Sequence, residues 1–353
     1  VTNAVAVIVA ATPCPLILAV PAAIIAGMSK SATRGVIVKG GGALEGLARA
    51  KTVLLDKTGT LTHGGPKIST ISFAPGVDAE RVIRLAASLE QSSPHVVAKA
   101  LVLEAQELDL RLSRATQVVE IHGTGLSGTV DGSEVYVGQP QSALPDWVDG
   151  TSALLVAVHV SKELVAVVGL DDPLRGDAVQ TLKTLRELGI TRIAMLSGDR
   201  KSTAEALAKR LNMDAVFAEC KPADKLEILR AEMDATPGAV IVVGDGINDA
   251  PALAAADVGV AMGARGATAA SEAADVVILE DSIGHLASAI EIAQGALSRA
   301  MQAAMVGMGL ATVAMFLAAF GQISPTASAV VQEFIDAAAI LWALVPVKSR
   351  RTI

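Results

Sequence analysis

The chain has 353 residues, of which 52% are hydrophobic and only 2% aromatic, and its formal net charge at pH 7 is -7. The mean hydropathy of +0.51 is high for a soluble protein, and the length is enough for two or more domains. The acidic balance, with no basic cluster in the middle of the sequence, argues against nucleic-acid binding. Two cysteines exclude a disulfide framework and suit a reducing compartment.

Residues 1–34 are predicted to form a membrane helix. The stretch from Ala4 to Met28 carries no charge, and about 20 apolar residues cross a bilayer. A signal peptide is the alternative, but here the charges follow the apolar run and two prolines flank Cys14 inside it. Prolines free backbone carbonyls, which is tolerated at membrane depth only where they line a site. We therefore expect Cys14 to bind a metal ion, the alternative being a buried structural cysteine.

Residues 35–65 and 169–297 are predicted to form one cytoplasmic α/β domain. The hydrophobic run "VLLD" ends in Asp56. This pattern is typical of a buried strand that brings a carboxylate to the edge of a parallel sheet. The strand-like runs "RIAMLSGD" and "AVIVVGDG" contain Asp199 and Asp245 at equivalent ends. Because strands and helices alternate, we predict a doubly wound sheet with the three carboxylates gathered at one edge.

Residues 66–168 show a different pattern. Two helical segments, 78–91 and 95–108, are followed by short strands with alternating apolar and polar residues. Such alternation is typical of antiparallel sheets. The sequence therefore predicts an α+β domain inserted between the two parts of the α/β domain.

Residues 298–347 are predicted to form two further membrane helices, separated by "GQISP". Glu333 and Asp336 lie one turn apart in the last of them. Carboxylates within a span are costly and usually functional, although a structural polar contact between helices is the alternative. Basic residues border one end of every predicted span, which places the α/β domain in the cytoplasm; they are Lys30, Arg34, Lys39, Arg299, Lys348, Arg350 and Arg351.

The α/β segments carry a set of residues suited to phosphoryl transfer. A lone strand-end carboxylate such as Asp56 is most often structural, but other groups accompany it. Lys225 can neutralise phosphate oxygens, Ser197 offers a hydroxyl, and Asp245 and Asp249 are hard oxygen ligands for Mg²⁺. A nucleophile, a magnesium site, a hydroxyl and a lysine together indicate phosphoryl transfer. The sequence has no Gly-x-x-x-x-Gly-Lys-Ser/Thr loop, which excludes a P-loop enzyme.

Two motifs at these positions, "DKTGTLT" (56–62) and "GDGINDAPAL" (244–253), resemble those of the P-type ATPases. The segment "TPCPLILAVP" (12–21) is similar to the metal-binding helix of their heavy-metal-transporting branch. The resemblance covers nearly the whole chain. It implies a haloacid dehalogenase-like, Rossmann-like phosphorylation domain, an inserted α+β nucleotide-binding domain, and three transmembrane α-helices.

The resemblance assigns roles to the phosphoryl-transfer residues. It makes Asp56 the residue that ATP phosphorylates, and it places Mg²⁺ between Asp56, the Thr58 carbonyl and Asp245. The other positions that match the phosphorylation domain are Lys57, Ser197, Gly198, Asp199, Lys225, Asn248 and Asp249. Soluble phosphatases of this fold usually carry a second aspartate, a general acid/base, two residues after the nucleophile. Thr58 stands there in this chain, which predicts a phosphoenzyme that persists.

The inserted domain is expected to bind ATP. The segment "SSPHVVAKAL" is similar to the family's Ser-Glu-His-Pro segment and puts His95 at the adenine-contacting place, although Val96 stands where the family has proline. By the same resemblance, Gly123 and Gly125 are a nucleotide-binding glycine pair, with Glu90 as a further candidate. A tight hairpin is the alternative for the glycines, and an ordinary surface or core histidine is the alternative for His95.

The predicted cargo is a divalent transition-metal ion. Thr12 replaces the first cysteine of the Cys-Pro-Cys that heavy-metal pumps often carry, and this weakens the case for Cu(I). One thiolate, Cys14, with the carboxylates Glu333 and Asp336 favours a divalent ion instead.

The family has earlier spans and an actuator domain with a Thr-Gly-Glu loop, which this sequence does not contain. We therefore expect the C-terminal portion of a larger pump in the lipid bilayer of a bacterial plasma membrane, with the N-terminal half as a missing partner. Alone, the chain is expected to be phosphorylated at Asp56 without completing a transport cycle.

Three other functions compete with a heavy-metal pump. A membrane-tethered phosphatase of the same fold is the main alternative, and both Thr58 and the inserted domain argue against it. A non-enzymatic membrane remnant is the second. A potassium or calcium pump is the third, and the "TPCP" segment favours a heavy metal over these ions.

Overall fold

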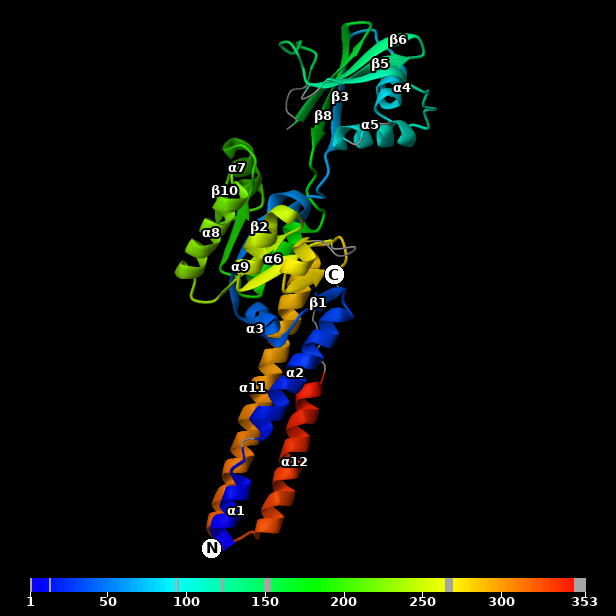
Figure 1. Ribbon diagram of the computed structural model, residues 1–353. Coiled ribbons are helices and arrows are strands. Elements are labelled where there is room, and N and C mark those ends of the chain that lie inside the picture. The colour runs from blue at the N-terminus through cyan, green and yellow to red at the C-terminus, as the bar shows by residue number, and fades with distance from the viewer. Residues whose placement is uncertain are drawn as a thin grey trace. The chain divides into compact units, whose positions relative to one another are not determined.

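The computed structural model in Figure 1 describes residues 2–12, 14–91, 93, 95–121, 124–148, 154–263 and 269–345. Gly123 and the side chain of Cys14 lie outside the described part. The chain forms two compact units. The first unit consists of Val1–Leu61 with Arg175–Ile353, and the second of Thr62–Leu174.

The first unit contains a seven-stranded sheet in the order β1-β13-β12-β11-β2-β9-β10. Only the edge strand β1 runs antiparallel to its neighbour, and the other pairs are parallel. The predicted doubly wound α/β sheet is thus confirmed. Its strands are β1 (Val36–Val38), β2 (Ala50–Asp56), β9 (Arg192–Leu196), β10 (Ala215–Phe217), β11 (Ala239–Gly244), β12 (Val258–Ala261) and β13 (Val276–Ile278).

Short helices cover this sheet and bury its central strands. Leu54 of β2 and Val242 of β11 pack in one cluster with Leu229 of α8 and Leu253 of α9. Strands buried on both faces read as continuous apolar runs, which explains "VLLD" and "AVIVVG". The helices are α3 (Gly41–Arg49), α6 (Ala178–Glu187), α7 (Lys201–Arg210), α8 (Pro222–Ala235), α9 (Ala250–Ala255) and α10 (Ala269–Ala273).

Four apolar helices extend from the sheet: α1 (Thr2–Ala10), α2 (Cys14–Ala32), α11 (Gly284–Ala319) and α12 (Pro325–Leu344). Among the described residues, α11 and α12 are long and apolar enough to cross a membrane. Two of the three predicted spans are therefore candidate spans by length and composition, and the count of three is not confirmed. The expected first span is divided because α1 ends before Thr12, at the start of the proline-rich "TPCP" segment, and the apolar stretch that follows, Leu16–Ala32, is shorter.

Figure 1 shows α2, α11 and α12 running side by side. Their contact is built from alanines, including Ala23 of α2, Ala300 of α11 and Ala339 of α12. Small residues let helix backbones approach closely in a membrane. At Gly27 of α2 a Cβ atom would lie 2.7 Å from the Cβ of Ala296, so this contact requires glycine.

The second unit is a six-stranded antiparallel sheet in the order β3-β8-β7-β6-β5-β4, with two helices packed on it. The expected antiparallel character is confirmed. Asp131 and Gly132 both have positive φ in the β5–β6 hairpin, as an Asp-Gly turn requires. The elements are β3 (Lys67–Phe73), α4 (Ala79–Glu90), α5 (Val96–Glu107), β4 (Thr116–Ile121), β5 (Gly125–Val130), β6 (Ser133–Gly138), β7 (Leu154–Val160) and β8 (Glu163–Asp171).

Candidate active site

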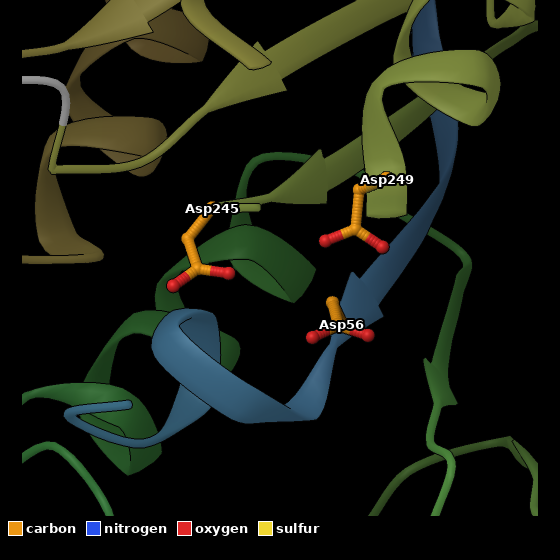
Figure 2. Close-up of side chains that lie close together, drawn as sticks. All are labelled: Asp56, Asp245 and Asp249. Carbon is orange, nitrogen blue, oxygen red and sulfur yellow. The ribbon is translucent and has the colours of Figure 1, made fainter. Parts of the chain in front are cut away.

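Three carboxylates meet at one edge of the parallel sheet. Asp56 is the last residue of β2, and Asp245 directly follows the neighbouring strand β11. A short 3₁₀ helix, Ile247–Asp249, then returns Asp249 to the same place. One carboxylate oxygen from each of the three lies within 4.8 Å of the others, and Figure 2 shows the three groups converging. The expectation that strand ends would gather carboxylates therefore holds for Asp56 and Asp245.

Lys225 of α8 is the cation at the centre of this group. Its Nζ donates a hydrogen bond to Asp56 Oδ1 at 2.6 Å and another to Asp249 Oδ1 at 2.7 Å. All three side chains are buried. Lys225 is held in reach because α8 begins with Pro222 at its first turn and is capped by Asp224, whose Oδ2 accepts from the Lys221 N–H at 2.8 Å.

The carboxylates carry more negative charge than the lysine can balance. Burial, and then the charge of Asp249, raise the pKa of Asp56 to about 6, while Lys225 works in the opposite direction. Burial also raises the pKa of Asp245. The pKa of Lys225 is raised as well, since its two carboxylate partners outweigh the effect of burial. A divalent cation bound by oxygen ligands would relieve this excess of negative charge, so the donor set fits Mg²⁺.

The strand on the other side of β2 supplies a second group of predicted residues. Ser197 directly follows β9, whose last residue Leu196 pairs with Asp56. Ser197 is buried, and its Oγ accepts a hydrogen bond from the Asp199 N–H at 3.1 Å. Asp199 does not join the three carboxylates; its Oδ2 instead accepts from Lys57 Nζ at 2.6 Å. Gly198 follows Ser197 in the loop after β9, Asn248 lies in the 3₁₀ helix after β11, and both are exposed.

The turn after Asp56 depends on a glycine. Gly59 has φ +74°, and a Cβ there would lie 1.6 Å from Asp245 Oδ2. Both observations exclude any residue other than glycine at position 59, because a positive φ is costly for a residue with a side chain and Asp245 already occupies the space. This turn presents Thr58, which is exposed, two residues after Asp56.

Sequence reasoning missed Arg175, a buried residue that holds this turn. Its Nη2 donates to the Gly59 carbonyl at 2.8 Å, and its Nε donates to the Thr60 carbonyl at 2.8 Å. Its Nη1 pairs with the Asp281 carboxylate at 2.5 Å. The available signal was "DDPLRGD", a charged cluster at the end of the inserted segment, but nothing in its spacing points to the turn after Asp56.

The second unit contains a cavity of about 350 Å³ that gathers three of the predicted nucleotide-binding residues, Glu90, His95 and Gly125. Glu90 ends α4, and His95 precedes α5. Glu90 is buried, and burial raises its pKa, against the hydrogen bond from Ser93 and the charge of His95. The rest of the lining is mainly apolar and includes Ile121, Leu126, Val137, Leu154, Leu155 and Val156.

One wall of this cavity is made by two glycines that pair across β5 and β6, Gly125 and Gly138. A Cβ on Gly125 would lie 2.3 Å from the Val137 carbonyl oxygen, and one on Gly138 would lie 2.2 Å from the Thr124 carbonyl oxygen. Gly138 was not among the predicted residues. It follows "EVYV" as an ordinary strand-end glycine, and only its pairing with Gly125 reveals its place in the wall.

Comparison with known proteins decides the family. Residues 50–257 match the haloacid dehalogenase-like hydrolases. The chain belongs to this family. It is 38% identical to copper-transporting ATPase 2 of Rhizobium meliloti (strain 1021) over 83% of its own length and 36% of the relative's. It is 36% identical to a cadmium, zinc and cobalt-transporting ATPase of Bacillus subtilis (strain 168) over 89% of its own length and 45% of the relative's.

A solved structure of a zinc-transporting PIB-type ATPase in its E2.Pi state superposes with a TM-score of 0.85 at 32% identity. The match covers 94% of this chain and 55% of that one. Within the haloacid dehalogenase-like hydrolases, the chain is thus a member of the heavy-metal branch of the P-type ATPases. It spans less than half the length of the two curated relatives that it matches.

The membrane part of this P-type ATPase chain separates the two predicted carboxylates. Asp336 is buried in α12, whereas Glu333 is exposed. Residues three apart differ by about 60° around a helix, so one can face the bundle while the other faces outward. Gln332, which sequence reasoning missed, donates from Nε2 to Asp336 Oδ1 at 3.1 Å and to the Thr12 carbonyl at 3.2 Å. Cys14 begins α2 two residues after Thr12.

Proposed function

We propose that this chain is the catalytic and C-terminal membrane part of an ATP-driven pump for a divalent transition-metal cation, which works through an aspartyl phosphate at Asp56. The observation that supports this most is the cluster of charged side chains at the sheet edge. One oxygen of the nucleophilic carboxylate lies within 4.8 Å of an oxygen from each of two further carboxylates, and one lysine donates hydrogen bonds to two of the three. This is the arrangement that phosphoryl transfer to a carboxylate needs.

In the proposed reaction, a carboxylate oxygen of Asp56 attacks the γ-phosphorus of ATP. A bond forms between that oxygen and phosphorus, and the bond from phosphorus to the bridging oxygen breaks, so that ADP leaves with the electron pair. Lys225 lies beside Asp56 and balances the charge of the transferred phosphoryl group. Ser197 offers a hydroxyl to its oxygens.

Asp56, Asp245 and the Thr58 carbonyl would hold Mg²⁺, with Asp249 beside them, and the ion would shield the negative charge of the phosphates. The chain's own residues then have to position the nucleophile. Gly59 keeps the turn after Asp56 clear of Asp245, and Arg175 holds the same turn through two backbone carbonyls.

The phosphoenzyme is proposed to persist because Thr58 cannot act as a general acid or base near neutral pH. The position two residues after the nucleophile is the one where phosphatases of this fold usually carry an aspartate. The hydroxyl of Thr58 leaves water without a proton acceptor there. A persistent aspartyl phosphate suits a pump, since the bound phosphoryl group must survive a conformational change before it is hydrolysed.

The cavity of the second unit is the proposed site for the adenosine part of ATP. A largely apolar lining with a few polar groups suits a flat purine ring, and Glu90 and His95 supply the polar groups. The bare wall at Gly125 and Gly138 leaves room for a ring to lie against the backbone. Gly123 remains a prediction.

The proposed cargo site lies where α12 faces the break between α1 and α2. Asp336 offers a buried carboxylate, and Cys14 stands at the start of α2. Within the described residues, the Ser328 Oγ and the Gln332 Oε1 are buried without a hydrogen-bond partner. Buried polar oxygens without partners are unusual, and a bound cation would satisfy them. Glu333 stays a prediction as a further ligand.

Labelling with γ-phosphate-labelled ATP and Mg²⁺ tests the central step. We expect acid-stable, hydroxylamine-sensitive label on the chain, and we expect Asp56→Asn to abolish it because the amide is not a nucleophile. Asp234→Asn, which changes an exposed aspartate on α8, is the matched control and should label normally. Label that survives in Asp56→Asn, or a folded chain that takes up none, would contradict the proposal.

A further inference from the structure

The end of the helix bundle nearest the sheet contains a second cavity, of about 280 Å³, between α2, α11 and the end of α12. Lys30 and Arg299 line it, together with the hydroxyl-bearing residues Ser29 and Thr33. Among the described residues that line the cavity, none is acidic. The cavity therefore combines positive charge with hydroxyl groups and lacks a built-in anion.

Within the described part of the chain, no carboxylate neutralises the two cations of this cavity. Neither Lys30 nor Arg299 forms an ion pair with a described residue. The Arg299 guanidinium instead lies over the Trp342 ring, with its carbon 4.7 Å from the ring centroid. Stacking on tryptophan orients the guanidinium and leaves its N–H donors free to bind an anion.

An apolar groove of about 270 Å³ lies next to this cavity along α11 and α12. Its lining includes Ala303, Val306 and Leu310 of α11. These residues follow Arg299 at intervals of three and four, so they continue the helix face that carries Arg299. Trp342 lines the groove and also stacks with Arg299, and it thereby joins the apolar groove to the basic cavity.

The level of Arg299 along α11 fits a membrane–water interface. From Ala300 to Ala319 the helix carries no charge, which amounts to about 30 Å, the thickness of the hydrocarbon core. Lys30 lies in the last turn of α2, and Trp342 lies near the end of α12. Basic residues and tryptophan are typical of this level. The groove from Arg299 to Leu310 then runs about 16 Å into the apolar layer.

We propose that the basic cavity and the apolar groove together bind one anionic phospholipid. Its phosphate would lie between Lys30 and Arg299, and one acyl chain would lie in the groove between α11 and α12. A free phosphate shares the headgroup chemistry but does not account for the apolar half. The inference rests on the membrane position proposed for α11 and α12, and lipid binding can be measured without ATPase or transport activity.

The test is lipid retention by the full chain in detergent, measured by native mass spectrometry with equal amounts of phosphatidylglycerol and phosphatidylcholine. We expect one phosphatidylglycerol to be retained in preference. The double variant Lys30→Ala with Arg299→Ala should lower its affinity by about 25-fold, since each cation near a membrane surface contributes roughly fivefold. Arg34→Ala is the matched control, because Arg34 lies near the same helix end but does not line the cavity.

A second pair of variants tests the apolar half while both cations stay in place. Val306→Phe should narrow the groove and weaken phosphatidylglycerol binding several-fold. Val306 is 63% exposed, so the change leaves the helix packing intact. Met305→Phe, at a neighbouring exposed position outside the groove, is the control and should bind as the parent chain does.

Four outcomes would overturn the proposal. Equal retention of phosphatidylcholine would mean that the site does not distinguish an anionic headgroup from a zwitterionic one. An equal loss in Arg34→Ala would indicate general surface electrostatics. An unchanged affinity in Val306→Phe would remove the groove from the site. Displacement of the lipid by millimolar inorganic phosphate would indicate a phosphate site without a lipid component. Circular dichroism of each variant confirms that its helices remain folded.

Discussion

The candidate active site in the first unit is crowded with charge, whereas the cavity in the second unit is lined mainly by apolar side chains and glycines. At the sheet edge, Lys225 donates hydrogen bonds to Asp56 and Asp249. All three charged groups are buried, and each offsets part of the cost of burying the others. In the cavity, Gly125 and Gly138 contribute by having no side chain. The first site is arranged for a reaction and the second for holding a ligand. Substitutions should therefore affect chemistry in one unit and affinity in the other.

The sharpest way to break the active site without changing a charge is Gly59→Ala. The new methyl group would overlap Asp245 Oδ2, and alanine would have to adopt a positive φ. Displacing the turn by about 1 Å would misplace Asp56 against the phosphate, and we expect the rate of phosphoenzyme formation to fall by about 100-fold. Rapid-quench labelling with ATP measures that rate.

Gly42→Ala provides the control for Gly59→Ala. Gly42 lies in the first turn of α3, and a Cβ there meets nothing within 4 Å. This variant should form phosphoenzyme at the parent rate. If both variants label normally, the close approach of the Gly59 turn to Asp245 has no part in catalysis.

Removal of the central cation should affect stability as well as chemistry. In Lys225→Met, Asp56 and Asp249 remain buried without their partner, and we expect a loss of about 3 kcal/mol in the free energy of unfolding. Thermal unfolding without Mg²⁺ measures this loss. Millimolar Mg²⁺ should restore part of it, because the ion would replace the missing positive charge.

The control for Lys225 is Lys201→Met. Lys201 is exposed and forms an exposed ion pair with Glu205 one turn away on α7, so its loss should change stability by less than about 0.5 kcal/mol. An equal loss of stability in both variants would mean that the buried position of Lys225 between two carboxylates adds nothing to its effect. A Lys225→Met chain as stable as the parent would mean that the three carboxylates do not need the lysine.

The contrast between the two sites also separates what the sequence could predict from what it could not. The strand-end positions of Asp56 and Asp245 predicted that the two side chains would meet, because neighbouring parallel strands end at the same edge of a sheet. Asp199 was expected there too, but its loop directs it to Lys57 instead. Loop direction after a strand depends on contacts from distant segments, which local sequence does not encode.

Arg175 and Gly138 were missed for a related reason. Arg175 acts on the turn at Gly59 across more than a hundred residues of sequence, and Gly138 matters only through its partner Gly125. In the membrane part, hydrophobicity predicted α11 and α12 well. The burial of Asp336 and the exposure of Glu333 follow from helix packing, which an apolar run without a clear stripe does not reveal.

In the second unit, Gly138→Val should change ATP affinity and local strand packing, but not the chemistry at Asp56. A Cβ there would lie 2.2 Å from the Thr124 carbonyl oxygen and 2.7 Å from the Gly125 Cα, so the strands that line the cavity must shift, and we expect the affinity for ATP to fall by about tenfold. Labelling of Asp56 at saturating ATP should be unchanged, since nothing at the sheet edge has moved. Calorimetric titration with a non-hydrolysable ATP analogue measures the affinity.

Gly65→Ala is the glycine control in the same unit, because a Cβ at Gly65 meets nothing within 4 Å. It should bind the analogue as the parent does. If Gly138→Val also binds normally, the cavity is not where the nucleotide lies.

The smallest expected effect is that of Glu90→Gln on stability. Burial raises the pKa of Glu90 above its usual value of 4.5, so the unfolded chain releases this proton at a lower pH than the folded chain does. Folding is therefore penalised by this group as pH rises above 4.5, and the penalty grows until the pH passes the raised pKa of the folded chain. Glutamine carries no charge across this pH range.

We thus expect Glu90→Gln to raise the melting temperature slightly at pH 7 and to leave it unchanged at pH 4. Glu134→Gln, at an exposed position on β6, should leave it unchanged at both pH values. Glu90→Gln should also weaken ATP binding, because the neutral amide oxygen is a weaker acceptor than the carboxylate for a hydrogen bond from the adenine amino group. A variant that gains stability and keeps full affinity would show that Glu90 is buried for packing, and this would leave His95 and the two glycines to define the nucleotide site.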